Sequence, residues 1–222
     1  MRRWLEENGL TIAALALFLL SLIGQILAGQ SVFNDEARQH GSATLGLLAY
    51  LKSGAFSEAL FENWESEFLQ MGLFVILTKF LRQKGSSESK KLDGKEETDE
   101  DPREHRDDPE APWPVRAGGV VLFVYERSLS LALFALFIGA FLMHAWGGMR
   151  AENEDQLRHG GELVTFFGYI GGSKFWFESF QNWQSEFFSV AALVVLSIFL
   201  RERGSPQSKP VAKAHHKTEA EA

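Results

Sequence analysis

The chain has 222 residues, a length that fits one medium-sized domain or two small ones. It contains no cysteine, which excludes disulfides and thiolate metal sites. Its formal net charge of −7 argues against nucleic-acid binding, which needs a basic face. The mean hydropathy of −0.09 resembles that of a soluble protein. That average is misleading, because Leu10–Ala28 holds no charged residue whereas Lys84–Arg116 is crowded with them.

The first predicted element is an apolar helix over about Leu10–Gly29. Its length matches the roughly 20 residues needed to cross the hydrocarbon core of a bilayer. An apolar run behind the basic start Met1-Arg2-Arg3 also fits a secretory signal peptide. A similar run recurs inside the chain, at Leu129–Trp146, where no signal peptide is removed. We therefore expect the first helix to be retained.

A long loop and a second helix follow. Within the loop Gln30–Glu65, the segment Thr44–Leu51 is apolar and predicts a short helix at the outer membrane interface. The apolar part of the next helix, Phe68–Leu81, has only 14 residues. A span of about 20 residues that ends at Leu81 must begin near Glu62. We therefore expect a long helix that starts outside the membrane and then runs through it.

The segment after this helix is strongly polar. Lys84–Arg116 contains only four apolar residues, too few to offset the entropy lost on ordering it. It is predicted to be a disordered connector. Its end, Pro112–Val115, has two candidate docking places, the membrane and the second hairpin.

The rest of the chain repeats the first part. Leu10–Lys90 aligns with Leu129–Lys209 at an offset of 119 residues, without a gap and with 26 identities in 81 positions. The densest shared block pairs Asn63–Phe68 with Asn182–Phe187. This indicates a two-helix hairpin duplicated in tandem. The predicted domains are a first transmembrane hairpin at residues 1–82, a disordered cytoplasmic linker at 83–119, a second transmembrane hairpin at 120–203 and a disordered cytoplasmic tail at 204–222.

The basic residues give an orientation. The N-terminus, the linker with its flanks from Lys79 to Arg127, and the C-terminal residues from Arg201 onward hold 17 of the 22 lysines and arginines. Because basic residues concentrate on the cytoplasmic side, both termini are expected there, and the two hairpins are parallel. The sequence thus predicts an all-α integral membrane protein with four transmembrane helices from two tandem parallel-repeat hairpins, and with short interfacial helices in the outer loops.

The main candidate site is a pair of acidic residues at equivalent positions, Glu67 and Glu186. An ionisable residue within a span is costly and suggests a function. An asparagine precedes each glutamate by four residues, on the same helical face. Gln25 aligns with His144 at a similar expected depth in the other helices. The expected polar layer contains Glu67, Glu186, Asn63, Asn182, His144 and Gln25.

Two interpretations of this layer remain open. It is either a proton or cation site, with a carboxylate–histidine metal site as a special case, or a structural feature at the level of the lipid headgroups. Trp64 and Trp183 are expected to be interfacial anchors. We find no motif for a nucleophile, a phosphate-binding loop or a zinc site. No catalytic residue, cofactor or resident metal is therefore expected.

The repeated Asn-Trp-x-Ser-Glu-Phe block, the following Phe-Leu-Arg-x-x-Gly-Ser-x-x-Ser-Lys and the linker from Glu100 to Arg116 are similar to a bacterial family of membrane proteins catalogued only as a domain of unknown function. The resemblance covers the chain except about its last dozen residues. It implies a bacterial plasma-membrane setting and carries no activity.

The leading functional hypothesis is a non-enzymatic scaffold or envelope-associated membrane protein. The alternative is a small transporter or channel component that uses the polar layer around Glu67 and Glu186, and this alternative requires a homo-oligomer. The expected partners are the lipid bilayer, a second copy of the chain and a cytoplasmic protein that binds the linker. Nucleic acid is not among them.

Overall fold

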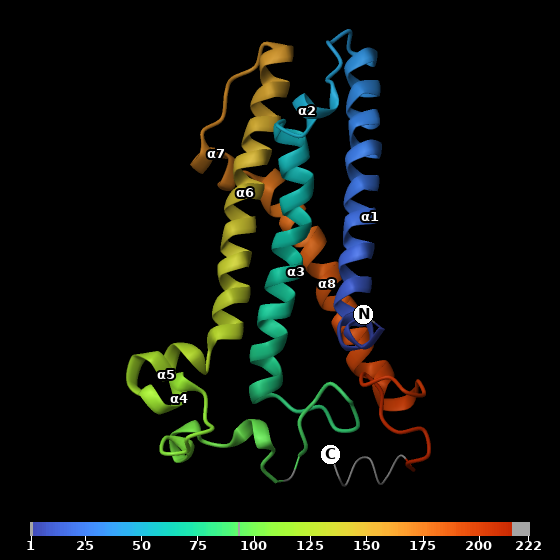
Figure 1. Cartoon of the computed structure of the whole chain (residues 1–222). Coiled ribbons are helices and arrows are strands. Elements are labelled where there is room, and N and C mark those ends of the chain that lie inside the picture. Colours follow the sequence, from blue (N-terminus) through green and yellow to red (C-terminus); the bar gives the residue numbers. More distant parts are fainter. Residues whose placement is uncertain (1, 93, 215–222) are drawn as a thin grey trace. The chain divides into compact units, whose positions relative to one another are not determined.

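Helices make up the regular structure of the chain. The computed structural model describes residues 2–92 and 94–214, and this part contains helices, turns and loops but no strand. The prediction of an all-α protein is confirmed. In chain order the elements are α1 (Arg2–Gln39), α2 (Leu47–Tyr50), α3 (Gly54–Phe80), the 3-10 turns η1 (Glu97–Asp99) and η2 (Pro102–His105), α4 (Trp113–Ala117), α5 (Gly119–Tyr125), α6 (Ser128–His159), α7 (Phe166–Ile170) and α8 (Ser173–Phe199) (Figure 1).

Within the described residues, three helices are long and apolar enough to cross a membrane: α1 over Arg3–Gln39, α6 and α8. α3 has 27 residues, as many as α8, but is not one of them. Its first half carries Glu58, Glu62, Glu65 and Glu67, which make this half strongly polar. Length and composition therefore support three of the four predicted spans.

The described chain forms two compact units. Unit 1 takes its residues from 1–61 and 143–172, and unit 2 from 62–142 and 173–222. Unit 1 accordingly contains α1, α2, the start of α3, the second half of α6, and α7. Unit 2 contains the remainder of α3, the connector with α4 and α5, the first half of α6, and α8.

Unit 1 packs two tyrosines against two glycines. Tyr50 of α2 and Tyr169 of α7 are both buried. A Cβ built on Gly29 of α1 would collide with the hydroxyl oxygen of Tyr50, and one on Gly148 of α6 with that of Tyr169. The two contacts lie 119 residues apart in the sequence. Burial raises the pKa of the Tyr50 hydroxyl. Only glycine leaves room for each ring on its helix.

Glycines also bring the start of α3 onto α6 in unit 1. A Cβ on Gly54 would lie 2.7 Å from the carbonyl oxygen of Gly147, and a Cβ on Gly147 would lie 2.8 Å from the Cβ of Ser57. Such distances are too short for real side chains, so the two backbones touch directly. Close approach of this kind is typical of small residues at helix interfaces in membranes.

Two asparagines of unit 1 hold the loops that follow α1 and α6. The side-chain amide of Asn34 donates to the carbonyl of Leu45 at 3.0 Å and accepts from its N–H at 2.7 Å. Asn153 makes the same two bonds with Val164, at 3.0 and 2.7 Å. Each pair fixes the loop just before the short helix α2 or α7. α2 lies within the apolar segment Thr44–Leu51 that predicts it, and α7 lies within the aligned apolar segment, residues 163–170.

Unit 2 combines a close helix contact with a cluster of aromatic rings. A Cβ on Gly72 of α3 would lie 3.3 Å from the ring of Phe134 on α6, and Leu133 is buried beside it. Rings from α6 and α8 lie with centroids 5.0–6.3 Å apart. The members of this cluster are Phe137, Phe141, Phe175, Trp176, Phe180 and Trp183.

α3 and α8 end in the same way in unit 2. Arg82 donates to two carbonyls at the end of α3, at 3.1 and 3.3 Å, and Arg201 donates to three at the end of α8, at 2.8–3.2 Å. A glycine with positive φ follows in each case, Gly85 at 88° and Gly204 at 86°. These donors satisfy carbonyls that a helix end leaves unpaired. The repeated Phe-Leu-Arg-x-x-Gly sequence thus ends both helices.

The connector between α3 and α4 has local structure in unit 2. The ammonium of Lys90 and the amide of Glu96 bond the carboxylate of Asp99 and hold the pKa of this group below its ordinary value. Ser86 is buried, and its hydroxyl lies 2.7 Å from that of Ser197 on α8. The predicted disorder of residues 83–119 stays a prediction. Residues 215–222 of the predicted tail lie outside the described residues.

The glycine–tyrosine contact of unit 1 predicts a large cost for one added methyl group. Gly29→Ala should lower the free energy of unfolding by about 1–3 kcal/mol, because the new Cβ overpacks against the Tyr50 hydroxyl. The measurement is thermal unfolding in detergent. Tyr50→Phe removes the colliding oxygen and should restore most of the loss in the double variant.

Gly24→Ala is the matched control on the same helix, since a Cβ there meets nothing within 4 Å. It should leave the melting temperature unchanged or raise it slightly, because alanine favours the helix. Equal melting temperatures for Gly29→Ala and Gly24→Ala would contradict the packing.

Candidate functional site

The residues predicted for the polar layer divide between the two units. Unit 2 holds Glu67, Glu186, Asn63 and Asn182. Gln25 and His144 belong to unit 1, so the six residues predicted for the layer do not all lie in one unit. The single layer stays a prediction, and each unit has its own polar groups.

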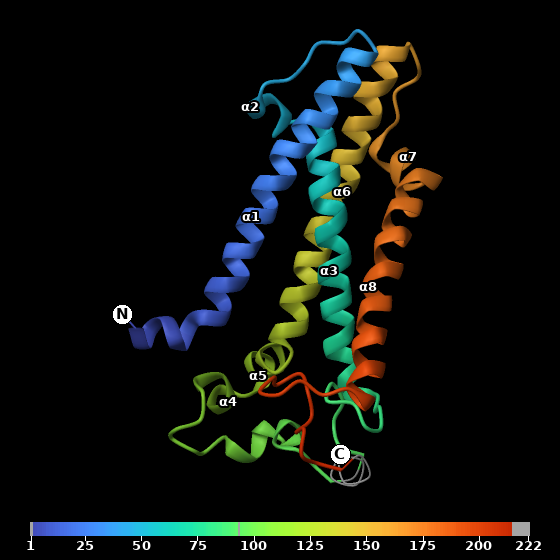
Figure 2. The same cartoon turned by 90° about the vertical axis from the view of Figure 1, so that its right-hand side faces the viewer.

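The predicted acidic pair lies on the two neighbouring helices of unit 2, α3 and α8 (Figure 2). Glu67 is exposed and Glu186 is half-buried. The surface of unit 2 therefore gives access to both side chains.

The two repeated asparagines have different surroundings. The amide of Asn182 on α8 donates to the carboxylate of Glu62 on α3, and also to the carbonyl of Glu178 at 3.1 Å. Asn63, its counterpart in the first copy, is exposed. The Asn182–Glu62 bond joins α8 to α3. The two asparagines therefore have different roles, although they are identical residues at aligned positions.

The most buried acid of the unit is Glu65, which sequence reasoning missed. Its exposed fraction is 0%, and that of the adjacent Ser66 is 2%. The hydroxyl of Ser66 donates to the carbonyl of Asn63 at 2.8 Å. Glu62 and Glu65 are three residues apart and share one face of α3. That face continues through the buried Leu69 and Gly72, a helical spacing that the sequence already contains.

Comparison of the copies could not find Glu62 and Glu65. The aligned residues are Gln181 and Gln184, so neither acid counts as a shared feature. The signal that would have found them is the periodicity of α3 itself. It places two acids in line with an apolar stripe.

The two predicted tryptophan anchors also differ. The ring of Trp64 contacts that of Phe68, with centroids 6.5 Å apart. Trp183 packs inside the aromatic cluster, 5.5 Å from Phe180 and 6.3 Å from Trp176. Among the described residues, its buried indole nitrogen finds no hydrogen-bond acceptor, and the buried hydroxyl of Ser179, one turn earlier on α8, finds no partner either. Trp183 is therefore part of the packing of unit 2.

Unit 1 has polar contacts of its own. Gln25 on α1 donates to the carbonyl of Ala59 on α3 at 3.4 Å. The hydroxyl of Tyr169 donates to the carboxylate of Glu58 at 3.0 Å. His144 on α6 is fully buried. These bonds join α1 and α7 to the start of α3.

The chemistry available in unit 2 is that of carboxylates held by an amide. Within residues 2–92 and 94–214, no three histidine, cysteine, aspartate or glutamate side chains gather as a metal site. Carboxylates of this kind can take up and release a proton, or bind a small cation. A buried ionised carboxylate is costly unless it is paired and hydrogen-bonded.

The Asn182–Glu62 bond predicts unequal effects for the two asparagines. Asn182→Leu should lower the free energy of unfolding by about 1–3 kcal/mol, because the Glu62 carboxylate loses its amide donor. Asn63→Leu, the matched control at the exposed position, should change it by less than about 0.5 kcal/mol. Chemical unfolding in detergent measures both, and equal losses would count against the bond.

Comparison with known proteins gives a family and no activity. No curated protein and no solved structure matches the chain. One family model, described as a domain of unknown function, matches residues 1–220. The chain therefore belongs to the family DUF6766.

Proposed function

We propose that the chain is a multi-pass membrane protein that transfers protons or small cations through the glutamates of unit 2. The observation that carries the proposal is the full burial of Glu65 on α3. Near it on α3, Glu62 is bonded by Asn182 of α8, and Glu67 and Glu186 lie on the same two helices.

The energetic argument concerns the cost of charge. An ionised carboxylate removed from water costs several kcal/mol unless a proton, a cation or hydrogen-bond donors compensate it. Ionisable groups within membrane segments accordingly mark ion and proton pathways by default. The exposed Glu67 and the half-buried Glu186 then offer a way from the surface of the unit toward its interior.

The proposal includes four spans, with α3 as the fourth beside α1, α6 and α8. The polar first half of α3 is tolerable at the membrane boundary or against other helices, and its second half is apolar. The duplication is supported by 26 identities in 81 positions, and by the glycine–tyrosine and asparagine–loop contacts that recur 119 residues apart. Four helices are few to enclose a pathway, so a homo-oligomer belongs to the proposal.

A second candidate is the non-enzymatic scaffold that the sequence favours. It is supported by two hydrogen bonds of the connector. The Ser86 hydroxyl bonds that of Ser197 on α8 at 2.7 Å, and the Ser87 hydroxyl donates to the carbonyl of Gln207, in the segment after α8, at 2.8 Å. A connector held against the helices can present one surface to a cytoplasmic partner. This candidate needs no ion flux, and flux therefore separates the two.

The flux experiment uses the full chain in liposomes that contain a pH-sensitive dye, with a potassium diffusion potential as the driving force. Wild type should acidify the lumen faster than protein-free liposomes. Glu65→Gln keeps the shape of the side chain but removes the titratable proton, and should reduce the rate to the protein-free level. Glu67→Gln combined with Glu186→Gln should also lower it.

Glu162→Gln, in an exposed loop of unit 1, is the control and should transfer protons as wild type does. Circular dichroism and gel filtration check that each variant folds. Absence of flux in wild type, or full flux in Glu65→Gln, would overturn the proposal and favour the scaffold.

The proposed setting is the plasma membrane of a bacterium, with both termini in the cytoplasm. The reason is that 17 of 22 basic residues lie before Leu10, between Lys79 and Arg127, or from Arg201 onward. The cysteine-free chain allows single cysteines to test this. An impermeant maleimide added to spheroplasts should label Ala43→Cys and Glu162→Cys, which are aligned positions in the two loops.

The same reagent should reach Glu104→Cys in the connector and Ala212→Cys in the tail only after the membrane is permeabilised. Labelling of one loop without the other would contradict parallel hairpins. Labelling of the connector from outside would reverse the orientation.

A further inference from the structure

The helices α4 and α5 form a compact pair in unit 2 (Figures 1 and 2). The turn between them is Gly118-Gly119, with φ of 67° and 58°, a left-handed conformation that favours glycine. Val115 of α4 and Leu122 of α5 are buried. The pair therefore has an inner apolar face of its own and does not depend on its outer face for packing.

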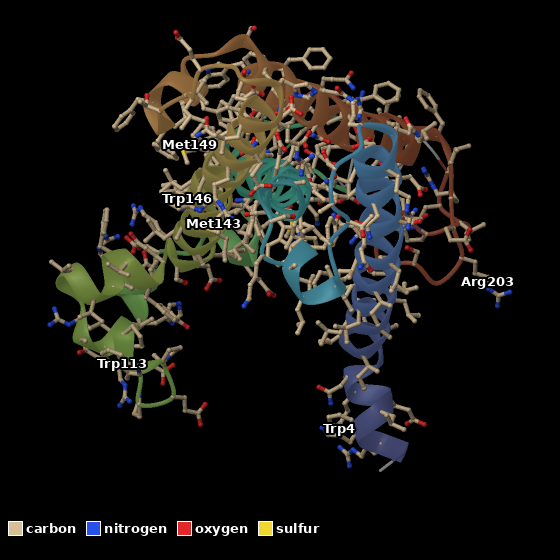
Figure 3. All side chains as sticks on the ribbon, turned by 90° about the horizontal axis from the view of Figure 1, so that it is seen from above. Trp4, Trp113, Met143, Trp146, Met149 and Arg203 are labelled. Carbon is tan, nitrogen blue, oxygen red and sulfur yellow. The ribbon has the colours of Figure 1, made fainter. Side chains whose placement is uncertain are left out.

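The outer face of the pair is also apolar. Trp113 is 65% exposed, Val120 79% and Phe123 52%. Figure 3 labels Trp113 on this part of the chain. A hollow of about 420 Å³ lies between Trp113, Pro114, Val120, Val121, Val124 and Tyr125. Single exposed apolar residues are common, but a continuous patch of this kind marks an interaction surface.

Arginines lie next to the α4–α5 pair, and two of them, Arg106 and Arg127, contact it. Arg106 and Arg116 are exposed, and among the described residues neither belongs to an ion pair. The guanidinium of Arg106 lies against the α4–α5 turn, with its Cζ 3.6 Å from the Cβ position of Gly118. Arg127 lies over the ring of Phe123, 4.1 Å from its centroid. Arginines around exposed tryptophan, phenylalanine and tyrosine are typical of the membrane–water boundary.

The position of the α4–α5 pair in the chain identifies lipid as the partner of its apolar outer face. α5 ends at Tyr125 and α6, a helix long and apolar enough to cross a membrane, begins at Ser128. The α4–α5 pair is thus two residues away from the end of a span and lies at the boundary of the bilayer. This holds for either orientation of the chain.

We propose that the α4–α5 pair is an interfacial anchor, whose apolar outer face enters the boundary between lipid headgroups and acyl chains while Arg106 and Arg116 bind phospholipid phosphates. Burial of the exposed apolar side chains stabilises the docked state, at about 25 cal/mol for each Å² removed from water. Guanidinium groups match phosphate oxygens with two parallel hydrogen bonds. The anchor depends on α6 crossing the bilayer and not on ion transfer.

The acidic residues of the adjoining loop are expected to stay in water. Asp107, Asp108 and Glu110 are exposed and precede α4. Lipid phosphates do not attract carboxylates, because both carry negative charge. The acidic loop should therefore stay in water while the α4–α5 pair lies deeper in the membrane interface. Asp107 therefore provides a control position within the same connector.

The experiment places a spin label on single cysteines of the full chain, reconstituted in vesicles of phosphatidylethanolamine and phosphatidylglycerol. The label at Val120→Cys should be more accessible to oxygen, which concentrates in the membrane, than to a water-soluble nickel chelate. The label at Asp107→Cys should show the opposite order. Val120 is so exposed that its replacement leaves the packing intact, and circular dichroism checks this.

Equal nickel accessibility at the two positions would overturn the anchor. A Val120→Cys label shielded from both reagents would do the same, because it would mean that protein covers the face, either a second copy or another partner. Arg106→Gln combined with Arg116→Gln should move the Val120→Cys label toward water. An unchanged label in that variant would overturn the phosphate contacts.

Discussion

The constraint on which the structure depends is the cost of placing carboxylates in an apolar helix. α3 must carry four glutamates in its first half, and an ionised carboxylate in apolar surroundings requires compensating donors. For two of the four, Glu58 and Glu62, the structure supplies donors from other helices. In unit 1 the Tyr169 hydroxyl donates to Glu58, and in unit 2 the Asn182 amide donates to Glu62. Within each unit, α3 is held by polar bonds that a purely apolar helix would not need. Because lipid offers no such donors, the acidic half of α3 is stable only against protein or at the boundary of the membrane.

The apolar patterns predicted where the helices lie, but they predicted the lengths of the helices less well. The short helices α2 and α7 lie within the apolar loop segments. The span estimated to end near Gly29 belongs to a helix that continues to Gln39, because residues 30–39 contain neither glycine nor proline to stop it. Span length is set by bilayer thickness, whereas helix length is set by backbone propensity and capping. α5 was not predicted, although the charged pair Glu126-Arg127 interrupts the apolar pattern at the point where α5 and α6 separate.

The candidate site was predictable only in part. Glu67 and Glu186 were predicted because both copies contain them, and they lie on the neighbouring helices α3 and α8. Glu65 was missed because a search for shared residues passes over positions where the copies differ. Its burial comes from tertiary packing of one face of α3, which an aligned pair of sequences does not encode. The same limit applies to Asn63 and Asn182, which are identical in sequence and unequal in exposure.

The shared and unshared positions divide by the kind of interaction they make. The identical glycine, tyrosine and arginine pairs serve packing and helix ends, for example Gly29 with Tyr50 and the carbonyl contacts of Arg82. These demands follow from backbone geometry, so both copies meet them with the same residue types. Hydrogen bonds to carboxylates do not depend on backbone geometry in this way. At the positions aligned with Glu62 and Glu65, the second copy has glutamine. An amide can donate where a carboxylate can only accept, so the two copies differ in the groups they present to one another's helices. Across the repeated sequence the packing contacts recur, whereas the one fully buried acid among the described residues, Glu65, lies in the first copy.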